Sequence, residues 1–155
     1  MDISRLPTPC PVIDLSVMRS NIAAMSAVLP GRALRPHVKA HKCSAIAAEQ
    51  VAVGHKTFTC ATPREILGLV AAGVGEDILL ANETVDPARL AALADAQSSA
   101  LITVAVDSLE TIQAASSAGI RNVLIDVNVG LPRCGCSPEQ AGSLADAARS
   151  LGLIV

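Results

Sequence analysis

This 155-residue chain contains the stretch Leu101-Ile102-Thr103-Val104-Ala105-Val106-Asp107, which is followed by the segment Ser108–Ala118. Together they have the pattern of one strand-and-helix unit. The stretch is rich in β-branched residues, which favour strands. The following segment has the amphipathic pattern of a helix, and Gly119 supplies a residue at which helices commonly end. The pattern therefore predicts a strand followed by a covering helix.

The same unit recurs along the chain about every 21–24 residues, the length of one strand plus one helix with short loops. The expected strands are Leu34–Lys39, Lys56–Cys60, Asp77–Ala81, Leu101–Asp107 and Arg121–Asn128. The expected helices lie near His41–Val53, Pro63–Ala72, Pro87–Ala96, Ser108–Ala118 and Pro138–Leu151. This alternation predicts an α/β fold in which a parallel sheet is covered by helices.

The ends of the chain bear on the architecture. Gly152–Val155 resembles the start of a sixth strand, whereas a complete eight-unit barrel runs to roughly 250 residues. We therefore expect an incomplete parallel (β/α) TIM barrel, truncated before completion, with about five units and the start of a sixth. A doubly wound domain fits the length better, but the chain has no glycine-rich loop after its first strand. The repeated strand-and-helix unit does not include an expected strand at Thr8–Leu15 or an expected helix near Met18–Leu29. Residues 1–30 are therefore expected to lead into a barrel formed by residues 31–155.

Composition excludes several classes of protein. The chain is 51% hydrophobic with a net charge of −2, whereas a duplex-binding protein needs clustered excess Lys and Arg. Only 1% of residues are aromatic, which excludes base-stacking surfaces. No apolar run reaches the roughly 20 residues that span a bilayer, and the amino terminus lacks the pattern of a signal peptide. Five scattered cysteines, an odd number, favour free thiols in a reducing cytoplasm.

The first expected strand places three basic side chains on one face. Side chains alternate along a strand, so Arg35, His37 and Lys39 share the face opposite Leu34, Pro36 and Val38. The apolar face should pack beneath helices, which points the basic face into the barrel, where cations are costly without an anion or cofactor. Cationic neighbours would favour the neutral, nucleophilic amine of Lys39. A structural ion pair is the alternative role for this lysine.

Five motifs in order and spacing resemble the D-threonine aldolase and D-serine dehydratase-like family. Its members are fold-type III pyridoxal phosphate (PLP) enzymes related to the amino-terminal barrel of alanine racemase. One of these motifs is the lysine motif Arg35-Pro36-His37-Val38-Lys39-Ala40-His41-Lys42, and it is their combination that makes the signal specific. The others are the opening segment Thr8–Leu15, the junctions Cys60–Glu65 and Leu80–Glu83, and the Gly-x-x-Arg-Cys-Gly loop within Asp126–Gly135.

The resemblance assigns roles to individual residues. Lys39 would carry PLP covalently, and Arg133 would lie near the phenolic oxygen of the cofactor and keep it ionised. His37 would line the same pocket, and Asn82 would lie at its rim. Asn128 stands where relatives more often have Asp, so it would keep hydrogen bonding to the cofactor site but lack the charge.

The resemblance also implies an activity. Family members are lyases that act on small-molecule β-hydroxy-D-amino acids, by aldol cleavage or dehydration, and the complete enzyme would be a homodimer. A divalent metal, Mn or Zn, held by His with Asp or Cys, would belong to a part of the family pattern with no counterpart in these 155 residues. The alternatives are a non-catalytic PLP-binding protein, an inactive remnant, or a racemase or deaminase of the same fold.

Two local patterns compete with this interpretation. His37 and His41, with Cys43 nearby, have spacing typical of zinc ligands, but a strand followed by a turn does not give them helical i, i+4 geometry. Cys134 and Cys136 are separated by one residue, whereas thioredoxin-like redox sites have two intervening residues.

Overall fold

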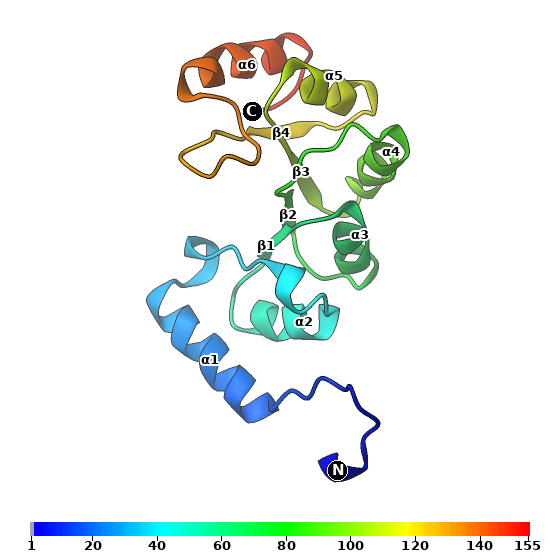
Figure 1. The fold of residues 1–155 in the computed structure, drawn as a ribbon, viewed down its shortest axis with the longest axis vertical. Coiled ribbons are helices and arrows are strands. Elements are labelled where there is room, and N and C mark those ends of the chain that lie inside the picture. The colour runs from blue at the N-terminus through cyan, green and yellow to red at the C-terminus, as the bar shows by residue number, and fades with distance from the viewer. Residues whose placement is uncertain (1) are drawn as a thin grey trace.

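The computed structural model describes residues 2–155 and contains a parallel sheet whose strands follow one another in chain order (Figure 1). The strands are β1 (Thr57–Cys60), β2 (Asp77–Leu80), β3 (Leu101–Val106) and β4 (Asn122–Ile125). Each pairs in parallel with the next, which requires a crossover helix between neighbours. The repeated unit predicted from the sequence is thereby confirmed.

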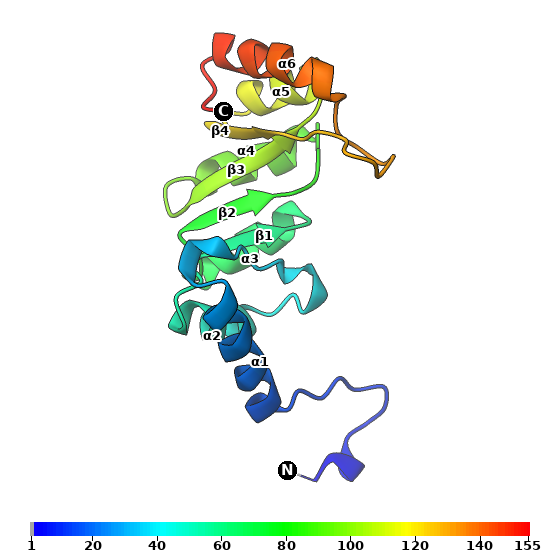
Figure 2. The same cartoon turned by 90° about the vertical axis from the view of Figure 1, so that its left-hand side faces the viewer.

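Helices cover one face of this sheet and leave the other face open (Figures 1 and 2). These helices are α2 (Ser44–Ala52), α3 (Pro63–Ala71), α4 (Pro87–Ala96), α5 (Leu109–Ser117) and α6 (Pro138–Ser150). Pro63, Pro87 and Pro138 each stand at a helix start, where the missing N–H costs nothing. A parallel sheet with helices on one face is an arc of a barrel wall.

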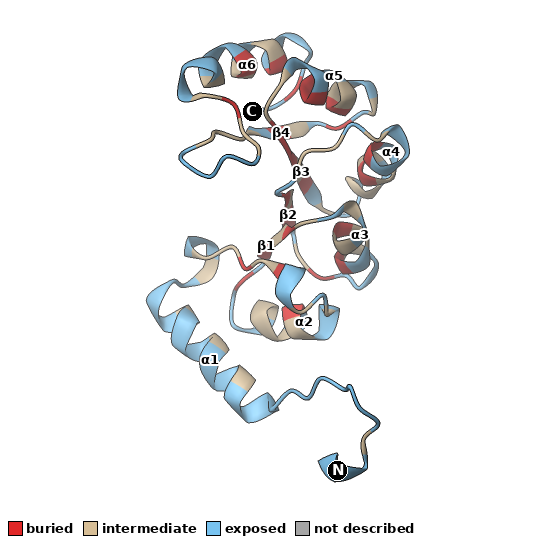
Figure 3. Ribbon diagram, in the orientation of Figure 1, coloured by how far each residue is buried: buried red, intermediate tan, exposed pale blue. Residues whose placement is uncertain are grey.

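The core lies between the sheet and the covering helices. Phe58, Ile78 and Ile102 are adjacent in the strand register, and all three are fully buried. Their alternating neighbours Thr59 and Leu79 point to the open face and are only half-buried. Figure 3 shows the buried residues concentrated on the strands and on the helix surfaces that face them. The two faces of the sheet therefore differ in burial as the alternation predicts.

The expected first strand, Leu34–Lys39, is wrong as an element although its alternation is correct. The segment forms a single bridge, between His37 and Thr59, and then enters a short 3-10 turn over Val38–Ala40. Pro36 has no N–H to give to a ladder, but its carbonyl accepts from Thr59 N at 2.8 Å. Pro36 and Val38 are buried and Lys39 is exposed.

The outermost segments also differ from expectation. The strand expected over Thr8–Leu15 is not formed, because prolines at 7, 9 and 11 remove every second backbone donor. The expected sixth strand is a single bridge between Asn122 and Ile154. Helix α1 (Leu15–Val28) has no buried residue and is held by side-chain contacts, with Arg19 bound to Glu49 and Ser26 hydrogen-bonded to the buried His55 at 2.5 Å.

Within residues 2–155, the structure contains no helix with both the length and the apolar character needed to cross a bilayer.

Candidate functional site at the carboxyl edge of the sheet

The carboxyl ends of the strands lie along one edge of the sheet, where barrel enzymes assemble their active sites. The turn that carries Lys39 follows the His37 bridge, Asn82 follows β2, and Asn128 follows β4. Figure 2 shows the strands running toward the side on which the loop after β4 projects. The topology therefore brings these segments, far apart in sequence, to a common edge.

The Lys39 turn, residues 37–42, presents an unpaired amine at this edge. Lys39 is exposed, and its backbone N–H donates to His37 Nδ1 at 3.3 Å. The chain has three lysines, and the other two are engaged, Lys42 with Glu65 and Lys56 with Glu76. Within the described part of the chain, Lys39 is thus the one lysine without a carboxylate partner.

Of the three basic side chains predicted to share the open face, Arg35, His37 and Lys39, only two remain available to a ligand. Arg35 donates two hydrogen bonds of 2.9 Å to the carboxylate of Asp77, and Asp77 is itself buried. This fork-to-fork pair neutralises the guanidinium. His37 and Lys39 remain, and burial, followed by the charge of Lys39, lowers the pKa of His37.

The loop that carries Arg133, residues 126–136, is held tightly to the sheet at its base. Asn128 N donates to Cys136 O and Cys136 N donates to Asp126 O, both at 2.9 Å. Gly135 N donates to Asp107 Oδ2 at 3.1 Å. A Cβ at Gly135 would lie 2.6 Å from Asn128 N, and its φ of +94° is a conformation that favours glycine. The second glycine of the Gly-x-x-Arg-Cys-Gly motif thus lets the two backbones approach closely.

The structure brings the predicted site residues to one edge but does not join them all. Asn128 Oδ1 accepts from Gly130 N at 2.9 Å, so this amide shapes the Arg133 loop. Arg133 and Asn82 are both exposed. In residues 2–155, no hydrogen bond or ion pair connects Lys39 with Asn82, Asn128 or Arg133.

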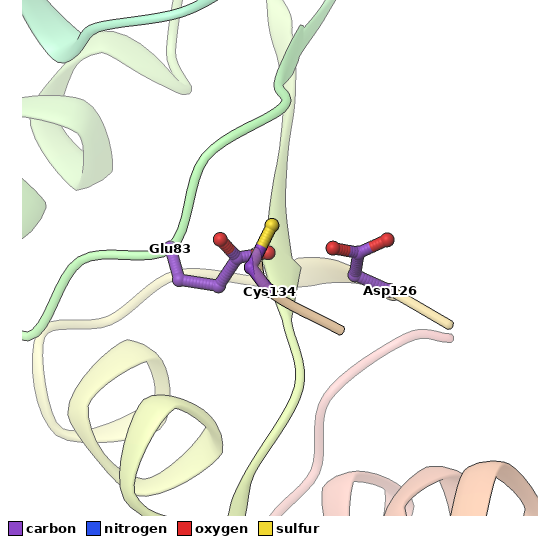
Figure 4. A group of neighbouring side chains, drawn as sticks. All are labelled: Glu83, Asp126 and Cys134. Atoms are coloured by element: carbon purple, nitrogen blue, oxygen red, sulfur yellow. The ribbon is translucent and has the colours of Figure 1, made fainter. Parts of the chain in front are cut away.

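Sequence reasoning missed a group of three side chains next to this loop. The ligand atoms of Glu83, Asp126 and Cys134 all lie within 4.8 Å of one another, and Figure 4 shows them converging from separate segments. One carboxylate oxygen of Glu83 is buried without a hydrogen-bond partner. Two carboxylates and a thiolate are oxygen and sulfur donors that bind divalent cations. The sequence contains one signal for this group, which is that Glu83 and Asp126 each lie just after a strand.

The three groups of this cluster affect one another's protonation. Burial raises the pKa of Glu83, and the nearby carboxyls of Asp126 and Asp107 raise it further. The Arg133 side chain lowers the pKa of the Cys134 thiol, but burial and the two carboxyl groups outweigh it, so the net shift is upward. These shifts favour the protonated carboxyl and thiol over three anions at close range.

The structure also shows the surroundings of the histidines and cysteines whose spacing suggests a zinc site or a redox site. His41 Nδ1 accepts from Cys43 N at 3.1 Å, as His37 Nδ1 does from Lys39 N, and the one group of close ligand atoms in residues 2–155 does not include these side chains. All five cysteines are free, as predicted. Cys60 lies in the core, where burial raises the pKa of its thiol to about 12 and makes it inert.

Comparison with known proteins agrees with this architecture. The chain is 40% identical to D-threonine aldolase from Arthrobacter sp over 96% of its length, covering 41% of that protein. It is 34% identical to D-threo-3-hydroxyaspartate dehydratase from Delftia sp. (strain HT23), covering 94% of this chain and 40% of that one. The crystal structure of D-threonine aldolase from Filomicrobium marinum superposes with a TM-score of 0.85 at 34% identity, covering 94% of this chain and 41% of that one.

The chain therefore spans about two fifths of the length of these relatives. The model of the alanine racemase N-terminal domain matches residues 13–155, and the match includes the sheet, the Lys39 turn and the Arg133 loop. This chain belongs to the alanine racemase N-terminal domain family.

Proposed function

We propose that this chain provides the cofactor-bearing lysine of a PLP-dependent lyase that acts on β-hydroxy-D-amino acids. The observation that carries the proposal is the unpaired amine of Lys39 at the carboxyl edge, while Lys42 and Lys56 are bound to carboxylates. The names of the relatives, an aldolase and a dehydratase, support the substrate class.

The residues present fit the aldehyde and phenolic groups of PLP. A free primary amine is the group that bonds covalently to an aldehyde, and Lys39 offers one in an exposed position. Arg133 is a cation that would hold an ionised oxygen, and Asn82 and Asn128 add amides at the same edge. When bound, PLP withdraws electrons from the substrate and so weakens the bond that is broken.

The protein side of the reaction would then rest on three tasks. Lys39 would hold the cofactor and would take or give a proton at its Nζ. His37 fixes the turn by accepting the Lys39 N–H, and its lowered pKa keeps the ring neutral near pH 7. Arg133 would help orient the cofactor through its charge.

The metal implied by the family does not fit the described residues. That metal is expected on His with Asp or Cys, whereas the one group of close ligand atoms in residues 2–155, Glu83, Asp126 and Cys134, contains no histidine. We therefore assign no metal-dependent step to this chain.

The wider assignments follow from the same proposal. Residues 31–155 would form the PLP-binding barrel segment and residues 1–30 its lead-in. The complete enzyme would be a cytoplasmic homodimer with a small-molecule substrate and no nucleic-acid or membrane partner. Dehydration is the second candidate reaction, because a dehydratase is among the relatives at 34% identity.

Borohydride reduction of the chain with bound PLP, followed by peptide mapping, tests the proposal. The pyridoxyl group should be found on Lys39, and Lys39→Ala should abolish labelling. Labelling of Lys42 or Lys56 instead would contradict it. If PLP is bound, release of glycine from D-threonine or 3-hydroxy-D-aspartate indicates aldol cleavage, whereas release of ammonia indicates dehydration.

A further inference from the structure

Lys42 has a backbone conformation that calls for an explanation. Its φ of 47° makes it the one non-glycine residue with positive φ among residues 2–155. L-residues adopt this left-handed conformation at an energetic cost, and such strain persists only where surrounding contacts enforce it. Lys42 lies three residues after Lys39, at the end of the Lys39 turn.

A chain of contacts holds Lys42 in place. Its backbone N–H donates to Val38 O at 2.7 Å, and its ammonium group is paired with Glu65. The side chain of Glu65 is only 7% exposed, and its other oxygen accepts from Ala61 N at 2.7 Å. Because Ala61 directly follows β1, the ion pair connects the end of the Lys39 turn to the end of a core strand.

The beginning of the turn is fixed independently. His37 forms the bridge with Thr59 in β1, and Thr59 N donates to Pro36 O at 2.8 Å. Lys39 therefore lies between two anchors, one made to β1 by the backbone before it and one made to Glu65 in α3 by a side-chain ion pair after it. Without the second anchor, the strained backbone at Lys42 is free to relax and to carry Lys39 with it.

The charges of the side chains around the Lys39 turn are consistent with an anchoring role for the Lys42–Glu65 pair. Glu65 is paired with Lys42, so the amino group in the turn without a carboxylate partner is that of Lys39. The electrostatic effects on His37 come from the same three residues, because Lys39 and Lys42 lower its pKa and Glu65 raises it. The pair thus affects both the backbone and the local charge beside the reactive amine.

We propose that the Lys42–Glu65 ion pair is a positioning device that holds the Lys39 turn so that the Lys39 amine reaches the cofactor. This inference rests on the proposed function, since it supposes that Lys39 takes PLP. Lys42 and Glu65 are positioning residues and need not contact the cofactor.

The experiment compares Lys42→Met and Glu65→Gln with two controls. Glu65→Gln keeps an acceptor for Ala61 N and removes the charge, and Lys42→Arg restores the cation. Lys56→Met breaks an ion pair of the same kind, with Glu76 at 2.7 Å, at the opposite edge of the sheet. Two readouts are taken on the full chain, amide hydrogen exchange of residues 38–43 and the rate at which Lys39 forms its covalent adduct with PLP. In that reaction the amine nitrogen bonds to the aldehyde carbon and water leaves, and borohydride then traps the product for mapping.

We expect both disrupting variants to exchange faster in residues 38–43 and to form the Lys39 adduct about tenfold more slowly, because small misplacements of a reacting group are costly. Lys42→Arg and Lys56→Met should behave like the wild type. An unchanged adduct rate in both disrupting variants overturns the proposal, whether or not exchange increases. If the wild-type chain itself forms no adduct at Lys39, the proposed function fails, and the positioning role fails with it.

Discussion

The two edges of the sheet use charged residues in opposite ways. At the amino edge, Asp77 is paired with Arg35 and Glu76 with Lys56. The Gln97 amide bridges Gly119 O and Arg121 N there. At the carboxyl edge, Lys42 is paired with Glu65, but Lys39 and Arg133 have no carboxylate partner within 4.0 Å among the described residues, and Glu83 keeps a buried, unpaired oxygen.

This difference indicates that the charged residues at the amino edge contribute mainly to stability, whereas those at the carboxyl edge contribute mainly to ligand binding. A folded chain gains by pairing buried charges, and it leaves polar groups unpaired mainly where a ligand will meet them. In barrel enzymes, conserved features at the amino-terminal face serve stability and those at the carboxyl-terminal face serve catalysis. Mutations at the two edges should therefore have separable effects.

Asp77→Asn should have the largest effect on stability. The change leaves the Arg35 guanidinium without its counter-charge in a partly buried position, and breaking such a pair costs about 3 kcal/mol. Urea unfolding of the variant should show this loss, while PLP labelling of Lys39 in the folded fraction stays at the wild-type level. A loss of stability below about 1 kcal/mol would mean that this pair is not an anchor of the amino edge.

Gly135→Ala should have an intermediate effect at the carboxyl edge. The added Cβ would lie 2.6 Å from Asn128 N, so the backbone of the Arg133 loop must shift, at a cost of about 2 kcal/mol. Limited proteolysis should show faster cleavage within residues 129–136. Gly142→Ala in α6 is the matched control, because nothing lies within 4 Å of its Cβ position and alanine favours a helix.

Glu83→Gln should have the smallest effect, and its sign should depend on pH. The raised pKa of Glu83 means that the folded chain holds this proton more tightly than the unfolded chain does. Its favourable contribution is therefore complete below the unfolded pKa, and it is lost as the pH rises through the folded pKa. The variant should match the wild type near pH 4 and melt about 2 °C higher near pH 7. A wild type that is more stable than the variant at pH 7 would show that Glu83 is paired as an anion.

The sequence was sufficient for the repeated unit and for the face on which Lys39 lies, while the role of Lys39 stays a prediction. Both depend on local patterns, namely the spacing of apolar runs and the alternation of side chains, which hold even where the strand at Leu34–Lys39 shrinks to one bridge. The strand does not extend over Leu34–Lys39 because Pro36, although apolar, has no N–H to give to a ladder.

The contacts between distant residues could not be read in the same way. The pairing of Arg35 with Asp77 joins the segment before the Lys39 turn to the start of β2, across the intervening β1, and no pattern in the sequence indicates it. The Glu83, Asp126 and Cys134 cluster required the curvature of the sheet and the path of the Arg133 loop. Alternation gives the face on which a side chain lies, but not its partner.

The chain-order arrangement of β1, β2, β3 and β4 also has a consequence for synthesis. Each strand pairs with the one made just before it, so a nascent chain can add one unit at a time to the wall already formed. Domains fold during translation at about 5–20 residues per second, which gives each new unit of this chain a second or more to dock. The contacts that hold the Lys39 turn, to Thr59 and to Glu65, all lie in the part of the chain that the ribosome makes well before Arg133.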